Sequence, residues 1–155
     1  MSGIVGGAGS KSGIIGQTEL DYEEGTWSPT FLGASSNPTQ SYARQYGDYK
    51  KVGKIVTVSF NVETSASGIS AGSGSCMIGG LPFTTSNSTL INHCGVMGRC
   101  GTWLVEAPNC MLCGTNQNYM YLLKGIGTNT DHTWIAATRI TNGTFCVGTL
   151  TYQID

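Results

Sequence analysis

Charged residues are scarce in this chain, and the two signs nearly cancel. Asp, Glu, Lys and Arg make up 11% of the 155 residues, against about 25% in typical soluble domains. Nine acidic side chains against eight basic ones leave a formal net charge of −1. Because binding to a phosphate backbone requires clustered Lys and Arg, this composition argues against a nucleic-acid partner.

The sequence also lacks a long apolar run. No stretch approaches the roughly 20 apolar residues of a membrane-spanning helix, so we expect no membrane insertion. The first residues, MSGIVGGAGSKSG, have neither the basic region nor the continuous apolar region of a secretory signal. The GGAGSKS segment lacks the glycines of a nucleotide-binding phosphate loop. We therefore expect synthesis in a cytoplasm and no cofactor.

Histidine is nearly absent, which limits the catalytic chemistry that the chain could perform. His93 and His132 are its two histidines. His93 precedes Cys94, but neighbouring residues of a strand project to opposite faces. A Cys–His catalytic pair at this position is therefore not favoured.

The six cysteines all lie after residue 75. Without an export signal, buried reduced thiols are the favoured interpretation over disulfides. A zinc site is a weaker alternative, because the candidate ligands do not form the two short pairs that are usual in zinc knuckles. Those ligands would be His93, Cys94, Cys100, Cys110 and Cys113, and the other cysteines are Cys76 and Cys146.

What the sequence does contain is glycine, above all near its start. Residues 1–18 hold six glycines and a single charged residue, a composition that makes an isolated helix or strand costly. Two aliphatic pairs interrupt it, Ile4-Val5 and Ile14-Ile15. We predict that residues 1–20 form an anchoring arm that orders against a partner, and that residues 21–155 form the folded domain.

The pattern after residue 25 indicates β-strands. Val56, Val58, Phe60 and Val62 alternate with polar residues, as in a half-buried strand. Many short strands and frequent turns predict an all-β, antiparallel β-sandwich with a jelly-roll-like arrangement. The expected strands are Thr26–Leu32, Tyr46–Val52, Lys54–Val62, Cys76–Leu81, Asn92–Val105, Cys110–Gly114, Tyr119–Gly125, Thr133–Ile140 and Thr144–Ile154. Turns are expected at Gly53 and at Asn142-Gly143.

Four of the nine acids lie within residues 19–24. Two of them, Glu23 and Glu24, could act as the carboxylates of a glycan-cleaving enzyme, which needs two such groups held about 5–9 Å apart across a cleft. The favoured interpretation is a solvated, turn-forming segment that joins the arm to the domain. Its acids would stay in solvent or meet a basic neighbour in an assembly. No enzymatic activity is expected.

Large aromatic residues have two interpretations. Trp27 and Trp134 are expected as core or interface anchors, the usual role of tryptophan. Tyr42, Tyr46 and Tyr119 are the candidates for exposed rings that could stack on a sugar.

Four segments, in this order, resemble a domain that is widespread in virion proteins of tailed phages. They are SGIIGQTELDYEEGTWSPTF (12–31), YGDYKKVGKIVTVSFNV (46–62), GLPFTT (80–85) and GTLTYQI (148–154). The domain is similar to the C-terminal domain of tail fibres and to head-decoration proteins, whereas residues 86–131 carry no part of this resemblance. The resemblance implies a β-rich, trimeric virion module without enzymatic activity.

The leading hypothesis is therefore a capsid decoration protein, either a cement protein or a head spike. The expected partners are two further copies of the chain and the major capsid protein or another virion protein. The alternative is a short tail fibre or spike that binds the host surface through the loops at 64–75, 84–92 and 114–118, with a surface glycan as a further partner. No metal site is expected. The predicted partner-binding residues are Ile4, Val5, Ile14, Ile15, Leu20, Tyr22 and Trp27.

Overall fold

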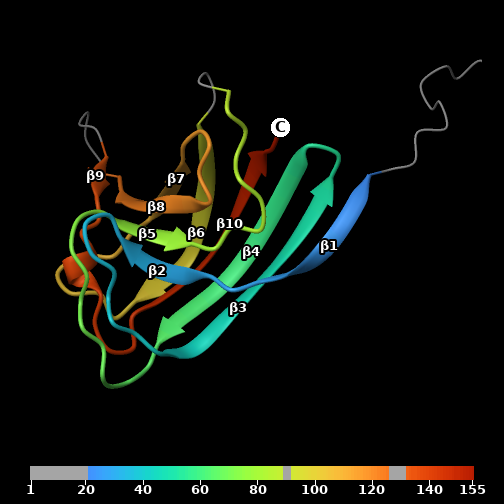
Figure 1. The fold of residues 1–155 in the computed structure, drawn as a ribbon. Helices are drawn as coiled ribbons and strands as arrows, with labels where there is room; N and C mark the ends of the chain where they lie inside the picture. The colour runs from blue at the N-terminus through green and yellow to red at the C-terminus, as the bar shows by residue number, and fades with distance from the viewer. Residues whose placement is uncertain (1–20, 89–91, 126–131) are drawn as a thin grey trace, which may run out of the picture.

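The computed structural model describes residues 21–88, 92–125 and 132–155 (Figure 1). Strands dominate these ranges, with one short 3-10 helix, η1 (Ala137–Arg139). The strands are β1 (Tyr22–Trp27), β2 (Thr30–Gly33), β3 (Tyr42–Val52), β4 (Ile55–Thr64), β5 (Cys76–Gly79), β6 (His93–Gly101), β7 (Cys110–Cys113), β8 (Tyr119–Lys124), β9 (Thr133–Trp134) and β10 (Phe145–Gln153).

The strands of the described residues form one antiparallel sheet. Its order is β1-β3-β4-β10-β6-β7-β8-β5-β2, and β9 pairs with β8. Although β1 and β2 are consecutive in the chain, they lie at opposite ends of this order. The sheet is curled, so that the shorter strands β2, β5 and β8 lie across from the long strands β3, β4 and β10 (Figure 1).

The core fills the space between these two walls. Val56 and Val58 of β4 and Tyr152 of β10 contribute side chains from the long wall, and Ile78 and Leu122 contribute from the short one. Each of these five side chains is at most 1% exposed. Burial of a large aliphatic side chain contributes roughly 1.5–3 kcal/mol, so this shared interior is what holds the curl closed.

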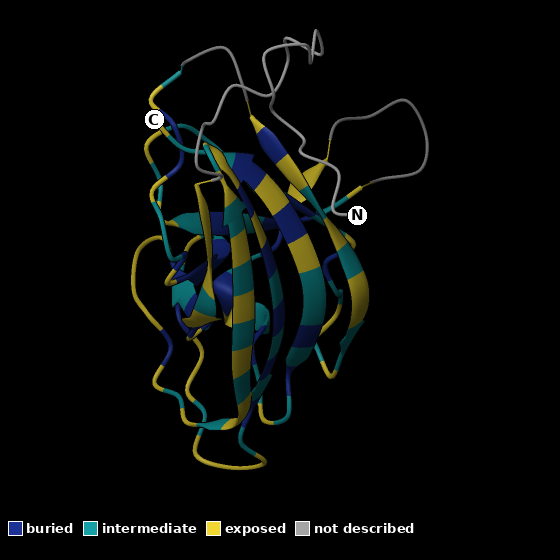
Figure 2. Ribbon diagram, turned by 90° about the vertical axis from the view of Figure 1, so that its right-hand side faces the viewer, coloured by how far each residue is buried: buried dark blue, intermediate teal, exposed yellow. Residues whose placement is uncertain are grey.

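The β3–β4 hairpin confirms the clearest sequence pattern. The four alternating apolar residues of β4 face the core, each at most 4% exposed: Val56, Val58, Phe60 and Val62. Gly53 connects the strands with φ at 56°, a left-handed conformation that glycine adopts without steric cost. Figure 2 shows the resulting alternation of exposed and less exposed positions along the strands.

The expected strand Thr26–Leu32 is wrong as a single element. Its residues divide between β1 and β2, which lie at opposite edges of the sheet. The break falls at Ser28-Pro29, and Pro29 has no N–H to donate to a sheet ladder. The residues before the break, expected as a solvated turn from 19 to 24, instead form β1 from Tyr22 onward.

The expected strand Thr133–Ile140 is also wrong over most of its length. Only Thr133 and Trp134 pair as a strand, and a 3-10 helix follows at Ala137–Arg139. Ile135, Ala137 and Ile140 are all buried in the core. Ile135 and Ala137 are two positions apart, as on one face of a strand. The 3-10 helix at Ala137–Arg139 then turns the chain, so that Ile140 also lies inside. The expected Asn142-Gly143 hairpin therefore has no preceding strand, although Gly143 does adopt a φ of 73°.

The structure thus confirms an all-β, antiparallel fold. The curled single sheet resembles a half-barrel, and the predicted sandwich with jelly-roll detail is not confirmed. The trimer remains a prediction. Among the described residues, no helix is long and apolar enough to cross a membrane.

Candidate functional site

The acidic segment pairs with the basic end of β3. In the antiparallel register of β1 and β3, Glu23 lies opposite Lys51 and Glu24 lies opposite Lys50. Opposite charges at facing positions of a sheet stabilise the pairing. One acid of this segment, Asp21, forms an ion pair with Lys51, so its basic neighbour belongs to the same chain.

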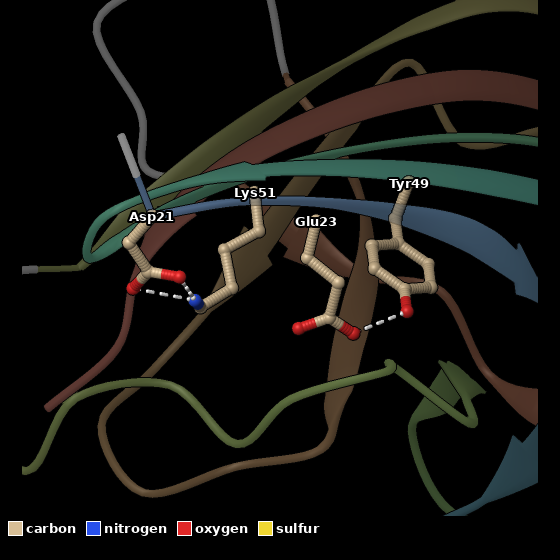
Figure 3. Close-up of polar contacts among 4 residues, drawn as sticks. All are labelled: Asp21, Glu23, Tyr49 and Lys51. Carbon is tan, nitrogen blue, oxygen red and sulfur yellow. Dashed lines mark hydrogen bonds and ion pairs between the residues drawn. The ribbon is translucent and has the colours of Figure 1, made fainter. Parts of the chain in front are cut away.

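Two contacts on the inner side of this strand pair are drawn in Figure 3. The Lys51 ammonium donates to both carboxylate oxygens of Asp21, at 2.7 and 2.8 Å. The Tyr49 hydroxyl donates to a carboxylate oxygen of Glu23 at 2.7 Å. This hydrogen bond to a carboxylate raises the pKa of Tyr49 above its ordinary value, because it favours the neutral phenol.

Tyr22 and Glu24 lie on the outer face of β1. Tyr22 is 49% exposed, and its hydroxyl donates to the Glu24 carboxylate, which raises the pKa of Tyr22. Because Glu23 and Glu24 are neighbours on one strand, their side chains project to opposite faces of the sheet. The geometry that two cooperating glycosidic carboxylates need, on either side of one cleft, is not present between these two residues.

Trp27 ends β1 with its side chain only 7% exposed. Its indole packs edge-on against Phe60, with ring centroids 6.1 Å apart, and its Nε1–H donates to the Ser59 carbonyl at 3.3 Å. In the single chain it is therefore mostly a core residue. The partner-binding roles of Tyr22 and Trp27 remain predictions.

An open groove of about 600 Å³ lies next to Trp27. It is built where β1 ends against the middle of β3 and β4. Its outward-facing wall carries an exposed ring, Tyr46, which is 68% exposed. The full lining is Thr26, Trp27, Ser28, Gln45, Tyr46, Gly47, Asp48, Ser59, Phe60 and Asn61.

The groove combines one aromatic face with short polar side chains. The Asp48 carboxylate accepts hydrogen bonds, the Asn61 amide both donates and accepts, and hydroxyls are supplied by Thr26, Ser28 and Ser59. In the part of the chain that the structure describes, Asp48 is the only charged residue of the lining. Flat aromatic surface beside several convergent hydrogen-bonding groups is the chemistry that a sugar ring requires, with its apolar face and its ring of hydroxyls.

A second set of rings lies on the outer face of β8 and β9. Tyr121 packs edge-on against Trp134 at 4.6 Å between ring centroids, and against Tyr119 at 5.4 Å. His132 adjoins Trp134 at 5.7 Å. Trp134 is 42% exposed, so it is not a core residue of the single chain, and its role as an interface anchor remains a prediction.

The candidate zinc ligands are dispersed by the fold. Cys100 lies opposite Cys146 across β6 and β10, whereas His93 lies opposite Cys113 across β6 and β7. Within the described residues, no three His, Cys, Asp or Glu side chains are placed to hold a metal ion.

The arm residues of the predicted site lie outside the described part of the chain. They are Ile4, Val5, Ile14, Ile15 and Leu20. Sequence reasoning singled out Tyr46 as a candidate exposed ring but did not find the groove around it. The sequence did contain a signal for the groove, because the outward-facing positions of two alternating segments supply part of its lining. These positions are Tyr46 and Asp48 in one segment and Ser59 and Asn61 in the other.

Comparison with known proteins gives one informative similarity. No protein-family model matches the chain, and no curated protein sequence does. Among solved structures, the fold is similar to that in the crystal structure of Dettilon tailspike protein (gp208), with a TM-score of 0.69 and 16% sequence identity. The match covers 85% of this chain and 24% of the tailspike chain. The chain therefore shares its fold with a limited part of a tailspike protein.

Proposed function

We propose that this chain is a virion protein of a tailed phage, and that its β-domain is a host-facing binding module of the adhesin type. The observation that carries the proposal is the fold likeness to a tailspike protein over 85% of the chain. The sequence resemblance to tail-fibre domains, carried by residues 12–85 and 148–154, supports the same class independently of that likeness.

The groove at Tyr46 is the surface through which the module would bind. Its open shape and its mixture of apolar and hydrogen-bonding surface suit a saccharide held by stacking on Tyr46 and by hydrogen bonds to Asp48 and Asn61. With a carboxylate and no basic residue among the described residues that line it, the groove favours neutral or amino sugars over acidic ones. The proposed activity is binding without cleavage.

Trimerisation would strengthen such binding. A low content of charge, 11% of residues, fits a surface that is partly covered by other copies. Three linked grooves would raise the overall avidity well above the affinity of a single one, provided that the receptor presents repeated sugars. The homotrimer is part of the proposal, as is the place of the protein on the virion.

Capsid decoration is the second candidate. It is favoured by the aliphatic pairs Ile4-Val5 and Ile14-Ile15 in a glycine-rich segment, which suit docking in an extended conformation on another virion protein. Deletion of residues 1–18 would then leave a soluble trimer that no longer binds virions. A high copy number per virion on a quantified gel would favour the capsid, and a low number would favour the tail.

The adhesin proposal is tested by binding of the purified full chain to glycan arrays and to host cells. Tyr46→Ala should abolish binding, because it removes the stacking surface. Val96→Ala is the control, because Val96 is a similarly exposed apolar side chain, at 67%, outside the groove lining. Equal binding by wild type and Tyr46→Ala would contradict a role for the groove, and failure of the wild type to bind any host cell or glycan would contradict the adhesin proposal.

A further inference from the structure

Two thiols face each other across the central strands. Cys100 of β6 and Cys146 of β10 are directly opposed in the antiparallel register. Their sulfur atoms are 3.3 Å apart. Directly opposed residues of an antiparallel pair have Cα atoms about 4.5 or 5.5 Å apart, and both separations lie within the range that a disulfide spans, about 4.4–6.8 Å.

The two thiols differ in access to solvent. Cys146 is fully buried, whereas Cys100 is partly exposed at the margin of the core. The hydrogen bond with Cys146 lowers the pKa of Cys100, because it stabilises the thiolate. Burial raises the pKa of Cys146 well above its ordinary value. Cys100 is thus the reactive member of the pair, and Cys146 is poised behind it.

We propose that Cys100 and Cys146 form a disulfide when the folded protein meets a small-molecule disulfide oxidant. The bond is a covalent modification of the mature fold and does not depend on the proposed adhesin role. Synthesis in a reducing compartment keeps both thiols free, and release into an oxidising medium allows the bond to form.

The chemistry is a pair of thiol–disulfide exchanges. The Cys100 thiolate attacks one sulfur of oxidised glutathione, forms a mixed disulfide and releases one glutathione thiolate. Cys146 then attacks the Cys100 sulfur, and its proton passes to the departing glutathione sulfur, which leaves as the second glutathione thiol. Two protein thiols are oxidised, one glutathione disulfide is reduced to two thiols, and the sulfur–sulfur separation shortens from 3.3 Å to about 2.0 Å.

The bond would fasten β10 to β6 at the end of the strand pair. It closes a loop between residues 46 positions apart in the chain, which restricts the unfolded chain and so stabilises the folded one. Cys94 is also on β6 but is exposed, and it lies opposite Leu112 rather than a cysteine.

The test incubates the full 155-residue chain with oxidised glutathione, blocks the remaining thiols by alkylation and maps the peptides by mass spectrometry. The expected product is a linked peptide pair containing Cys100 and Cys146, with Cys94 alkylated. The melting temperature should rise by roughly 5 °C or more relative to the reduced chain. Reduction with dithiothreitol should reverse both changes.

Two variants complete the design. Cys100→Ser, at a partly exposed position that tolerates a hydroxyl, should lose both the linked peptide and the rise in melting temperature. Cys94→Ser should retain both. Recovery of Cys100 and Cys146 in alkylated form after oxidation, or a bond between either of them and another cysteine or another chain, would overturn the proposal.

Discussion

The indole of Trp27 lies directly over Gly47, the residue opposite it in the β1–β3 pair. A Cβ at position 47 would lie 2.4 Å from the Trp27 Nε1 atom. Two residues earlier in β1, the glycine is on β1 and the aromatic residue is on β3. Gly25 lies opposite Tyr49, and a Cβ at position 25 would lie 2.8 Å from the Tyr49 ring. Each aromatic ring thus covers a facing glycine, and together they fix how β1 docks on β3.

Gly47→Ala is therefore expected to destabilise the domain by about 1–3 kcal/mol, the usual cost of forcing a side chain into a packed site. The added methyl group must displace the Trp27 ring from its place against Phe60 and from the Ser59 carbonyl. Urea unfolding followed by tryptophan fluorescence measures the change. Gly98→Ala, on β6 of the same sheet, is the matched control, because its Cβ would meet its nearest atom at 3.7 Å. Equal stability of Gly47→Ala and wild type would contradict the packing described for Trp27.

The Trp27–Gly47 and Gly25–Tyr49 pairs show why only part of the fold could be predicted from the sequence. The burial of Val56 and Val58 follows from local alternation, and the β3–β4 turn follows from Gly53. The pairing of Gly25 with Tyr49 depends on a register between strands more than 20 positions apart, which no local pattern encodes. The segments that carried the phage resemblance, GTW at 25–27 and YGDY at 46–49, turn out to be partners across this register.

The same limit applies to the candidate site. Tyr46 and Asp48 were visible as outward residues of one strand, but the groove exists only because Ser59, Asn61 and the end of β1 lie beside them. The division of Thr26–Leu32 into two strands also required long-range information. β2 is placed by its antiparallel pairing with β5, in which Thr30 lies opposite Gly79 and Gly33 lies opposite Cys76, and this register joins segments that are far apart in the chain.

The Asp21–Lys51 pair should contribute little to stability at physiological salt. The Lys51 side chain is 12% exposed, but that of Asp21 is 65% exposed, so solvent reaches the carboxylate and screens the pair; ion pairs open to solvent typically contribute about 0.2–1 kcal/mol. A double-mutant cycle with Asp21→Asn and Lys51→Met should give a coupling energy in that range, and it should shrink in 1 M salt, where the Debye length is about 3 Å. A coupling above about 2 kcal/mol that is insensitive to salt would contradict this assignment.

Tyr42→Phe should destabilise the domain by about 1–2 kcal/mol, because the Phe31 N–H loses its acceptor at 2.9 Å in a partly buried site. Burial raises the pKa of Tyr42 to about 12, so the hydroxyl remains a neutral hydrogen-bonding group throughout the working range of pH. Tyr46→Phe serves as the control, since Tyr46 is 68% exposed. Denaturant midpoints compare the three proteins, and equal losses in both variants would show that the Tyr42 contact has no special role.

The stability of the domain should fall as the pH drops through the titration range of His93. This imidazole is 9% exposed and packs against the Tyr152 ring, with centroids 6.4 Å apart. Burial lowers the pKa of His93 below its ordinary 6.5, because the charged form is poorly solvated there. The unfolded chain therefore binds the proton more tightly than the folded one. The contribution is fully present above pH 6.5 and is lost as the pH falls through the lower folded pKa, with a slope of at most about 1.4 kcal/mol per pH unit.

His93→Gln removes the titrating group while retaining a polar side chain of similar size. Its free energy of unfolding, measured in urea at pH 7.5, 6.5 and 5.5, should therefore decline less steeply with acid than that of the wild type. The comparison isolates one proton, because every other titrating group is common to both proteins. Parallel profiles of the two proteins would show that His93 is protonated as readily in the folded domain as in the unfolded chain. The imidazole would then be more solvated than its packing against the Tyr152 ring implies.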